Sequence, residues 1–177
     1  MAMDRSLPNR MIRAAKLDPE LYEEVENDES ATSQAALVVT IAALAAGVAA
    51  LIRDGVGTAI VGIIGALIGW VVWAAITYFV GKTFFATAET QVDMGEMMRA
   101  LGFSYAPGVL SIVGFVPILG GIVALVVGIW QLIAGVIAVR QALDVSTGRA
   151  VGTVIVGWLV QLAITFVIFL VISPFLT

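Results

Sequence analysis

The sequence contains no cysteine and no histidine. Without cysteine there are no disulfides and no thiolate chemistry, and without histidine there are no imidazole metal ligands, His-based triads or His proton relays. Charge is also scarce, since charged residues make up 12% of the chain, against about 25% in an average soluble domain. The sequence has no basic patch of the kind that would indicate nucleic-acid binding. We also expect no metal ion and no cofactor.

Apolar residues dominate what remains. They account for 60% of the 177 residues, which leaves too few polar side chains to cover a water-soluble globule. Eight of the thirteen acidic residues lie at or before Glu29, so the polar part is concentrated at the start. We therefore predict an all-α integral membrane protein with a cytosolic amphipathic head at residues 1–33 and a five-helix membrane domain at residues 34–177.

The head carries two helix-start signals. Residues 6–8 (Ser-Leu-Pro) and residues 18–20 (Asp-Pro-Glu) each place a capping residue before an early proline. We predict two short amphipathic helices on the membrane surface or on the bundle, and the alternative is a solvated, partly disordered tail. In the second helix, an apolar stripe is expected to be buried and the acids to face water. The stripe comprises Leu21, Tyr22 and Val25, and the acids are Glu23, Glu24 and Glu26.

Five apolar segments follow the head, and each has about the length that a membrane-spanning helix needs, roughly 17–25 residues. The links between the first and second segments and between the third and fourth are very short, which predicts antiparallel hairpins. Between the second and third, Asp93 and Glu96 have the spacing of a capping box, which predicts a short interfacial helix. The predicted spans are residues 34–52, 56–80, 101–119, 122–139 and 150–173.

The distribution of Lys and Arg predicts the orientation. With the N-terminus in the cytosol, only Arg53 of the nine basic residues lies outside and the other eight lie inside. Such a bias is the positive-inside signal, so we expect a cytoplasmic N-terminus and an external C-terminus.

The chain also resembles itself at an offset of 88 residues, which pairs residues 36–50 with 124–138 and residues 69–77 with 157–165. A duplication would relate the first two spans to the last two. Because one span lies between the pairs, the second pair would be inverted, as in many transporters. Chance similarity between apolar segments is the alternative.

No Asp, Glu, Lys or Arg lies deep inside a predicted span, which argues against a pump or a charge-selective channel. Gln131 and Gln161 lie at about 14 and 18 Å below the same surface, counted at 1.5 Å per residue. We predict an amide–amide bond between them, directly or through one water, with both side chains pointing into protein. The alternatives are a polar substrate contact and a contact with another subunit.

Glycine and proline mark two further features. Gly65 and Gly69 have the GxxxG spacing that lets membrane helices approach closely. Pro107 and Pro117 interrupt the central segment, which predicts either a tolerated kink or a hinge with a binding site. Tyr105, close to Pro107, could supply its hydroxyl to a freed carbonyl.

Three motifs resemble the prokaryotic branch of the Yip1 domain family. Residues 97–107 (MMRALGFSYAP), 116–120 (VPILG) and 128–132 (GIWQL) occur in the order of that branch's LGYSxAP, IPxLG and IWxL segments. The resemblance covers residues 30–177 and implies a cytosolic N-terminus, five spans and no catalytic residues. Residues 18–22 match the acidic-aromatic-Gly-Pro element of eukaryotic members only faintly, so their contact with small GTPases is not carried over.

We therefore expect a non-enzymatic accessory or scaffold protein of a prokaryotic plasma membrane, which organises a complex or the bilayer. Its partners would be membrane lipid and a protein partner or a second copy, with no nucleic acid. The alternative is a transporter or channel for a neutral or weakly polar solute.

Overall fold

The computed structural model describes residues 4–172, and within this part every regular element is a helix. The long helices match the long apolar runs, while the short helices begin at capping residues or prolines. In chain order the elements are α1 (Leu7–Ala15), α2 (Pro19–Glu26), α3 (Ala31–Asp54), α4 (Val56–Val80), a π-helical turn η1 (Gly81–Phe85), α5 (Met94–Phe103), a 3₁₀ helix η2 (Ala106–Phe115), α6 (Leu119–Ala142) and α7 (Thr147–Ile172).

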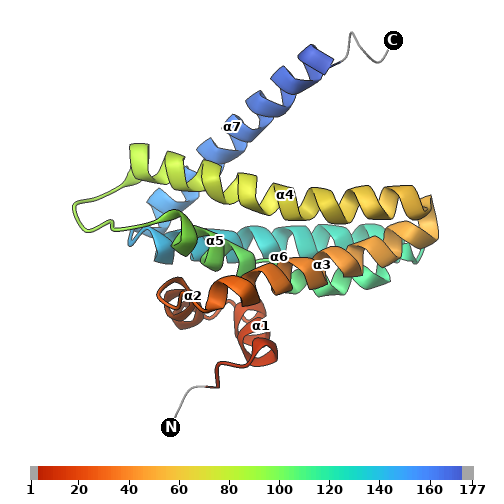
Figure 1. Ribbon diagram of the computed structural model, residues 1–177, viewed down its shortest axis with the longest axis horizontal. Helices are drawn as coiled ribbons and strands as arrows, with labels where there is room; N and C mark the ends of the chain where they lie inside the picture. The colour runs from red at the N-terminus through yellow and green to blue at the C-terminus, as the bar shows by residue number, and fades with distance from the viewer. Residues whose placement is uncertain (1–3, 173–177) are drawn as a thin grey trace.

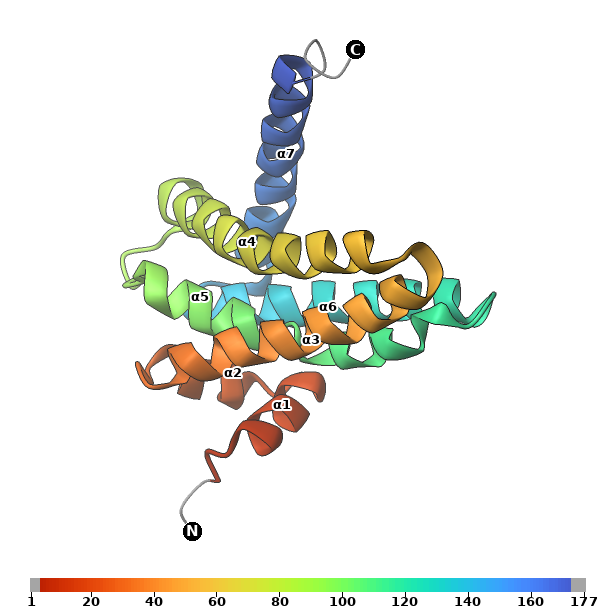
Figure 2. The same cartoon turned by 45° about the vertical axis from the view of Figure 1, so that its right-hand side comes forward.

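A bundle of α3, α4, α6 and the α5–η2 segment forms the body of the molecule (Figures 1 and 2). Its connections alternate between two ends. The loops after α4 and α6 meet at one end, where Thr90 donates a hydrogen bond to the carbonyl of Leu143 at 2.8 Å. We call this the head end, because α2 lies there. The α3–α4 link and the η2–α6 turn meet at the far end, where Arg53 and Gly120 line one cavity.

Four helices are long and apolar enough to cross a membrane within the described residues: α3, α4 with η1, α6 and α7. The chain is thus a multi-pass membrane protein. The predicted third span, 101–119, has a different form, because α5 ends at Phe103 and a 3₁₀ helix follows. At about 2.0 Å per residue, the ten residues of η2 extend about 20 Å.

The two prolines explain the form of this central segment. Pro107 lies in the first turn of η2, where its missing N–H leaves no hydrogen bond unmade. Pro117 follows Val116, whose backbone is extended and ends the 3₁₀ helix. The break predicted at the prolines is therefore present, and it replaces a kinked α-helix with two helices of different pitch.

The inverted repeat expected from the sequence stays a prediction. α3 and α4 meet at the far end and separate toward the head end, where α5 packs against both, while α7 follows α6 at the head end and leaves it at a steep angle (Figures 1 and 2). The repeat requires that α3 and α4 superpose on α6 and α7 after a rotation about an axis in the membrane plane. Much of α7 is exposed, including Leu159, Leu162 and Phe166.

Both predicted head helices are present. Ser6 is the N-cap of α1 with proline in the first turn, and the Asp18 carboxylate accepts a hydrogen bond from the backbone N–H of Glu20. The capping box between Asp93 and Glu96 at the start of α5 is also confirmed. The head packs against the bundle, where the indole of Trp130 in α6 donates to the carbonyl of Ala15 at 2.8 Å.

Candidate functional site

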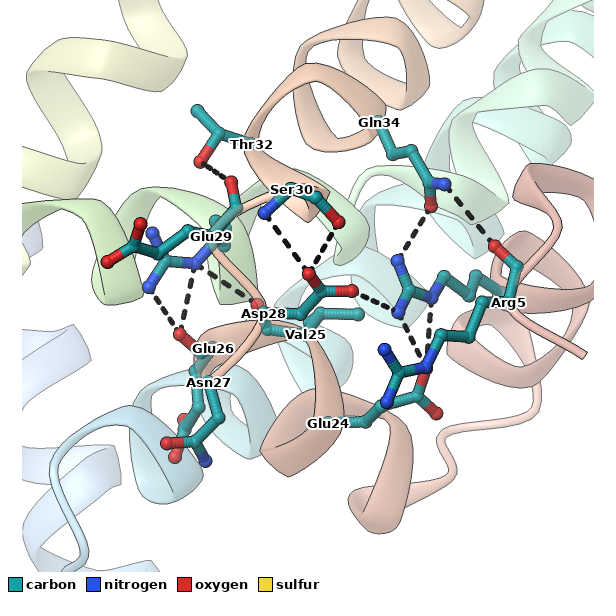
Figure 3. Close-up of polar contacts among 12 residues, drawn as sticks. Arg5, Glu24, Val25, Glu26, Asn27, Asp28, Glu29, Ser30, Thr32 and Gln34 are labelled. Atoms are coloured by element: carbon teal, nitrogen blue, oxygen red, sulfur yellow. Dashed lines mark hydrogen bonds and ion pairs between the residues drawn. The ribbon is translucent and has the colours of Figure 1, made fainter. Parts of the chain in front are cut away.

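The head is fastened by a buried arginine. Arg10 in α1 is 1% exposed and lies where three elements meet. Its guanidinium donates to the carboxylates of Glu24 at 2.7 Å and Asp28 at 2.6 Å, and to the amide oxygen of Gln34 at 3.0 Å. These three side chains converge in Figure 3. Arg10 therefore connects α1 to α2, to the α2–α3 link and to α3.

The acids of this network are held in their ionised form. Hydrogen bonds from the hydroxyl of Ser30 and from Arg10 lower the pKa of Asp28 to about 2. Glu24 receives a second guanidinium, since Arg13 donates to its other carboxylate oxygen at 2.6 Å. Charge on both sides of the network is therefore maintained at neutral pH.

A second arginine joins the head to α5. Arg99 is 6% exposed, and its guanidinium donates to the carbonyls of Val25, at 3.1 Å, and Glu26, at 3.0 Å. The last carbonyls of a helix have no partner within the helix, and they attract positive charge. Arg99 thus satisfies the C-terminal end of α2.

The sequence pattern predicted that the acids of α2 face water, but two of them are largely buried. Glu26 is 6% exposed, and the side chain of Glu24 is 11% exposed. Burial, followed by repulsion from Glu23, Asp144 and Glu96, raises the pKa of Glu26 to about 8. The amphipathic pattern failed here because α1 covers Glu24 through Arg10 and Arg13, and α5 and α6 pack on the side of α2 that holds Glu26.

A cavity of about 230 Å³ lies within the membrane part of the bundle. Its polar side chains come from Ser104 and Tyr105 after α5 and from Gln131 on α6, and Trp73 and Trp158 supply aromatic walls. The amide of Gln131 donates to the backbone carbonyl of Tyr105 at 3.4 Å. The structure thus brings together two of the residues that the sequence singled out.

Among the described residues, no hydrogen bond joins Gln131 to Gln161. The backbone carbonyl of Gln161 accepts the hydroxyl of Thr165 at 2.9 Å. Both glutamine side chains are half-buried.

The glycines fall into two groups. At Gly65 and Gly69 an added Cβ would meet nothing within 4 Å, so this GxxxG pair faces away from the rest of the chain. At Gly102 an added Cβ would lie 2.7 Å from the Cβ of Ala35, and at Gly108 it would lie 2.7 Å from Nε2 of Gln131. The second group sets the close approach between the central segment and its neighbours.

Sequence reasoning missed the two anchoring arginines and the role of Trp130. From the sequence, Arg10 and Arg99 were interpreted only as two of the basic residues on the cytosolic side. A signal for Arg10 existed in the surplus of acids in the second half of the head, which includes Glu24 and Asp28. No local pattern indicates that Trp130 reaches α1.

A comparison with protein families finds that the model described as the Yip1 domain matches residues 17–170. The match includes α2, all the helices of the bundle and most of α7. No curated protein matches the chain, and no solved structure matches it.

Proposed function

The chain belongs to the Yip1 domain family, and from this premise we propose that it is a non-enzymatic accessory or scaffold subunit that organises a membrane complex or the bilayer around it. The absence of cysteine and histidine supports a role without catalysis. The partners would be lipid and either another membrane protein or a second copy.

The outward-facing glycine pair on α4 carries this proposal. Gly65 and Gly69 are exposed, and they lie one helical turn apart on the same face. In lipid, rows of small residues allow two helices to approach closely and gain van der Waals contact. Since no helix among the described residues 4–172 occupies that face, the pair is available to a helix of a partner.

We further propose five membrane crossings, with a cytoplasmic N-terminus and an external C-terminus, in the plasma membrane of a prokaryote. The alternation of connections between the head end and the far end supports successive crossings by α3, α4, the α5–η2 segment and α6. Eight of the nine basic residues lie in the head or at the head end of the bundle, and Arg53 lies at the far end. This distribution supports a cytoplasmic head end.

The orientation can be tested by cysteine labelling, because the native chain has no cysteine. A cysteine at Ser146, in the α6–α7 connection, should react with an impermeant thiol reagent only from the cytosolic side. A cysteine at Asp54, at the end of α3, should react only from outside. Reaction of the two positions from the same side would contradict the alternating connections, and exchanged sides would reverse the orientation.

The scaffold role predicts loss of a partner without loss of folding. Replacing Gly65 and Gly69 together with Ile should lower recovery of a stoichiometric partner, after purification in mild detergent, by about tenfold, as expected if about 1.4 kcal/mol of contact is lost. Ala163→Ile adds bulk to an exposed position on α7 and serves as the matched control. Equal recovery from the double variant and the control would exclude the α4 face as the contact.

The cavity around Gln131 favours a second candidate, a transporter or channel for a neutral or weakly polar solute. Its polar lining from Ser104, Tyr105 and Gln131 carries no formal charge, which suits such a solute. Solute flux into liposomes containing the purified chain alone would support this candidate, and a stoichiometric partner with no flux would support the scaffold.

A further inference from the structure

Three carboxylates come together between the head and the bundle. Glu23 and Glu26 lie one turn apart on α2, and Asp144 lies just after α6 in the connection to α7. Their ligand oxygens all lie within 4.8 Å of one another. The amide of Gln141 donates to Glu23 at 3.4 Å, and so holds one of these side chains in place.

The middle member of this group lacks a partner. Oε2 of Glu26 is fully buried and has no hydrogen-bond partner among the described residues. An unsatisfied buried acceptor costs free energy, and an ionised one costs more. Arg99 does not relieve this cost by a hydrogen bond, because its guanidinium donates to the main-chain oxygens of Val25 and Glu26 instead.

The surroundings of Glu26 are negative. Glu23, Asp144 and Glu96 repel its charge, and Arg99 offsets only part of this repulsion. A buried carboxylate with an unpartnered oxygen, beside two further carboxylates and in a region with surplus negative charge, is what a bound cation would stabilise.

We propose that Glu23, Glu26 and Asp144 bind one hard divalent cation, of the Ca²⁺ or Mg²⁺ class, which fastens α2 to the α6–α7 connection. Such ions prefer oxygen ligands, and all three residues supply carboxylate oxygens. In a Ca²⁺ site, ligands on opposite sides of the ion lie about 4.6–5.2 Å apart, and adjacent ligands lie closer, so the observed separations fit one ion. Water would complete the coordination shell.

This site is independent of the proposed scaffold role. It was not expected from the sequence, since the chain has no cysteine or histidine and the third acid is far from the other two along the chain. Asp144 lies 118 residues after Glu26 in the sequence. A cation bound there would join α2 of the head to the α6–α7 connection, at a point separate from Arg10 and Arg99. The docking of the head would then depend on the concentration of the ion in the cytosol.

The experiment uses the full chain in detergent after treatment with a chelator. Titration calorimetry with Ca²⁺, and separately with Mg²⁺, should show one ion bound per chain for at least one of them. Asp144→Asn should weaken binding at least about tenfold, because it removes one charged ligand. The backbone φ of Asp144 is 51°, and Asn tolerates this left-handed conformation, so the variant should fold. Glu23→Gln is a second variant at an exposed position.

The matched control is Glu89→Gln, which removes an exposed acid from the loop after η1 and should leave the affinity unchanged. The bound ion should also slow trypsin cleavage after Lys16, whereas sodium chloride at equal ionic strength should not. The proposal is overturned if neither ion binds, if the control weakens binding as much as Asp144→Asn, or if sodium gives the same protection.

Discussion

Replacing Arg10 with Met should release the head from the bundle. The change removes the cation that Glu24 and Asp28 share while it keeps most of the apolar stem, so the main effect is the loss of charge pairing. Breaking a buried ion pair by removing one partner costs about 3–5 kcal/mol. We expect a value near 3 kcal/mol here, because Glu24 keeps Arg13 and Asp28 keeps Ser30.

The loss should fall on the head rather than on the whole molecule. Amide hydrogen exchange in α1 and α2 should therefore accelerate by about 100-fold, with little change in α3, α4 and α6. Lys16→Met removes a positive charge from an exposed position of the same segment and should change the exchange rates by less than about threefold. Equal exchange in the Arg10 variant and this control would refute the anchoring role of Arg10.

Replacing Gly102 with Val should destabilise the bundle itself. An added Cβ would lie 2.7 Å from the Cβ of Ala35 and 3.2 Å from its Cα, so α5 and α3 would have to separate. A rotamer change of Ala35 cannot relieve this clash, because the atoms involved are its Cβ and backbone. Overpacking of this kind costs about 1–3 kcal/mol, and the β-branched side chain places the effect near the upper value.

Thermal unfolding in detergent measures this effect. A loss of about 3 kcal/mol should lower Tm by roughly 6–12 °C in a chain of this size. Gly62→Ala is the matched control, since a Cβ there meets nothing within 4 Å. Alanine is the better helix former, so the control should hold or raise Tm. An unchanged Tm in the Gly102 variant would mean that α3 and α5 do not pack as closely as described.

Sequence reasoning predicted the helices well, because they depend on local information. The apolar runs gave the four long helices, and the capping signals at Asp18 and Asp93 placed the starts of α2 and α5 within one residue. The central segment was predicted as an interrupted span, but its 3₁₀ form was not. Pro107 and Pro117 locate a break without specifying the pitch of the helix between them.

The candidate sites were predicted less well, because they depend on how the helices cross. Depth arguments placed Gln131 and Gln161 at similar levels, but in the described residues Gln131 bonds to the carbonyl of Tyr105 and not to Gln161. Glu26 was placed on a solvated face because an α-helical pattern does not show which neighbours will cover it. Gly65 and Gly69 were assigned to close packing, and within the part of the chain that the structure describes nothing packs on that face.

The contacts of the head also set an order of events during synthesis. The carbonyl of Ala15 can form its hydrogen bond only after Trp130, 115 residues later in the chain, has been synthesised. The end of α2 is satisfied by Arg99, which lies more than 70 residues later. The ribosome therefore produces the head first, while its final position depends on segments that enter the membrane afterwards. A chain halted before α6 would hold the end of α2 through Arg99 but would lack the contact between Ala15 and Trp130. A head docked through both contacts is thus a sign that insertion has proceeded as far as α6.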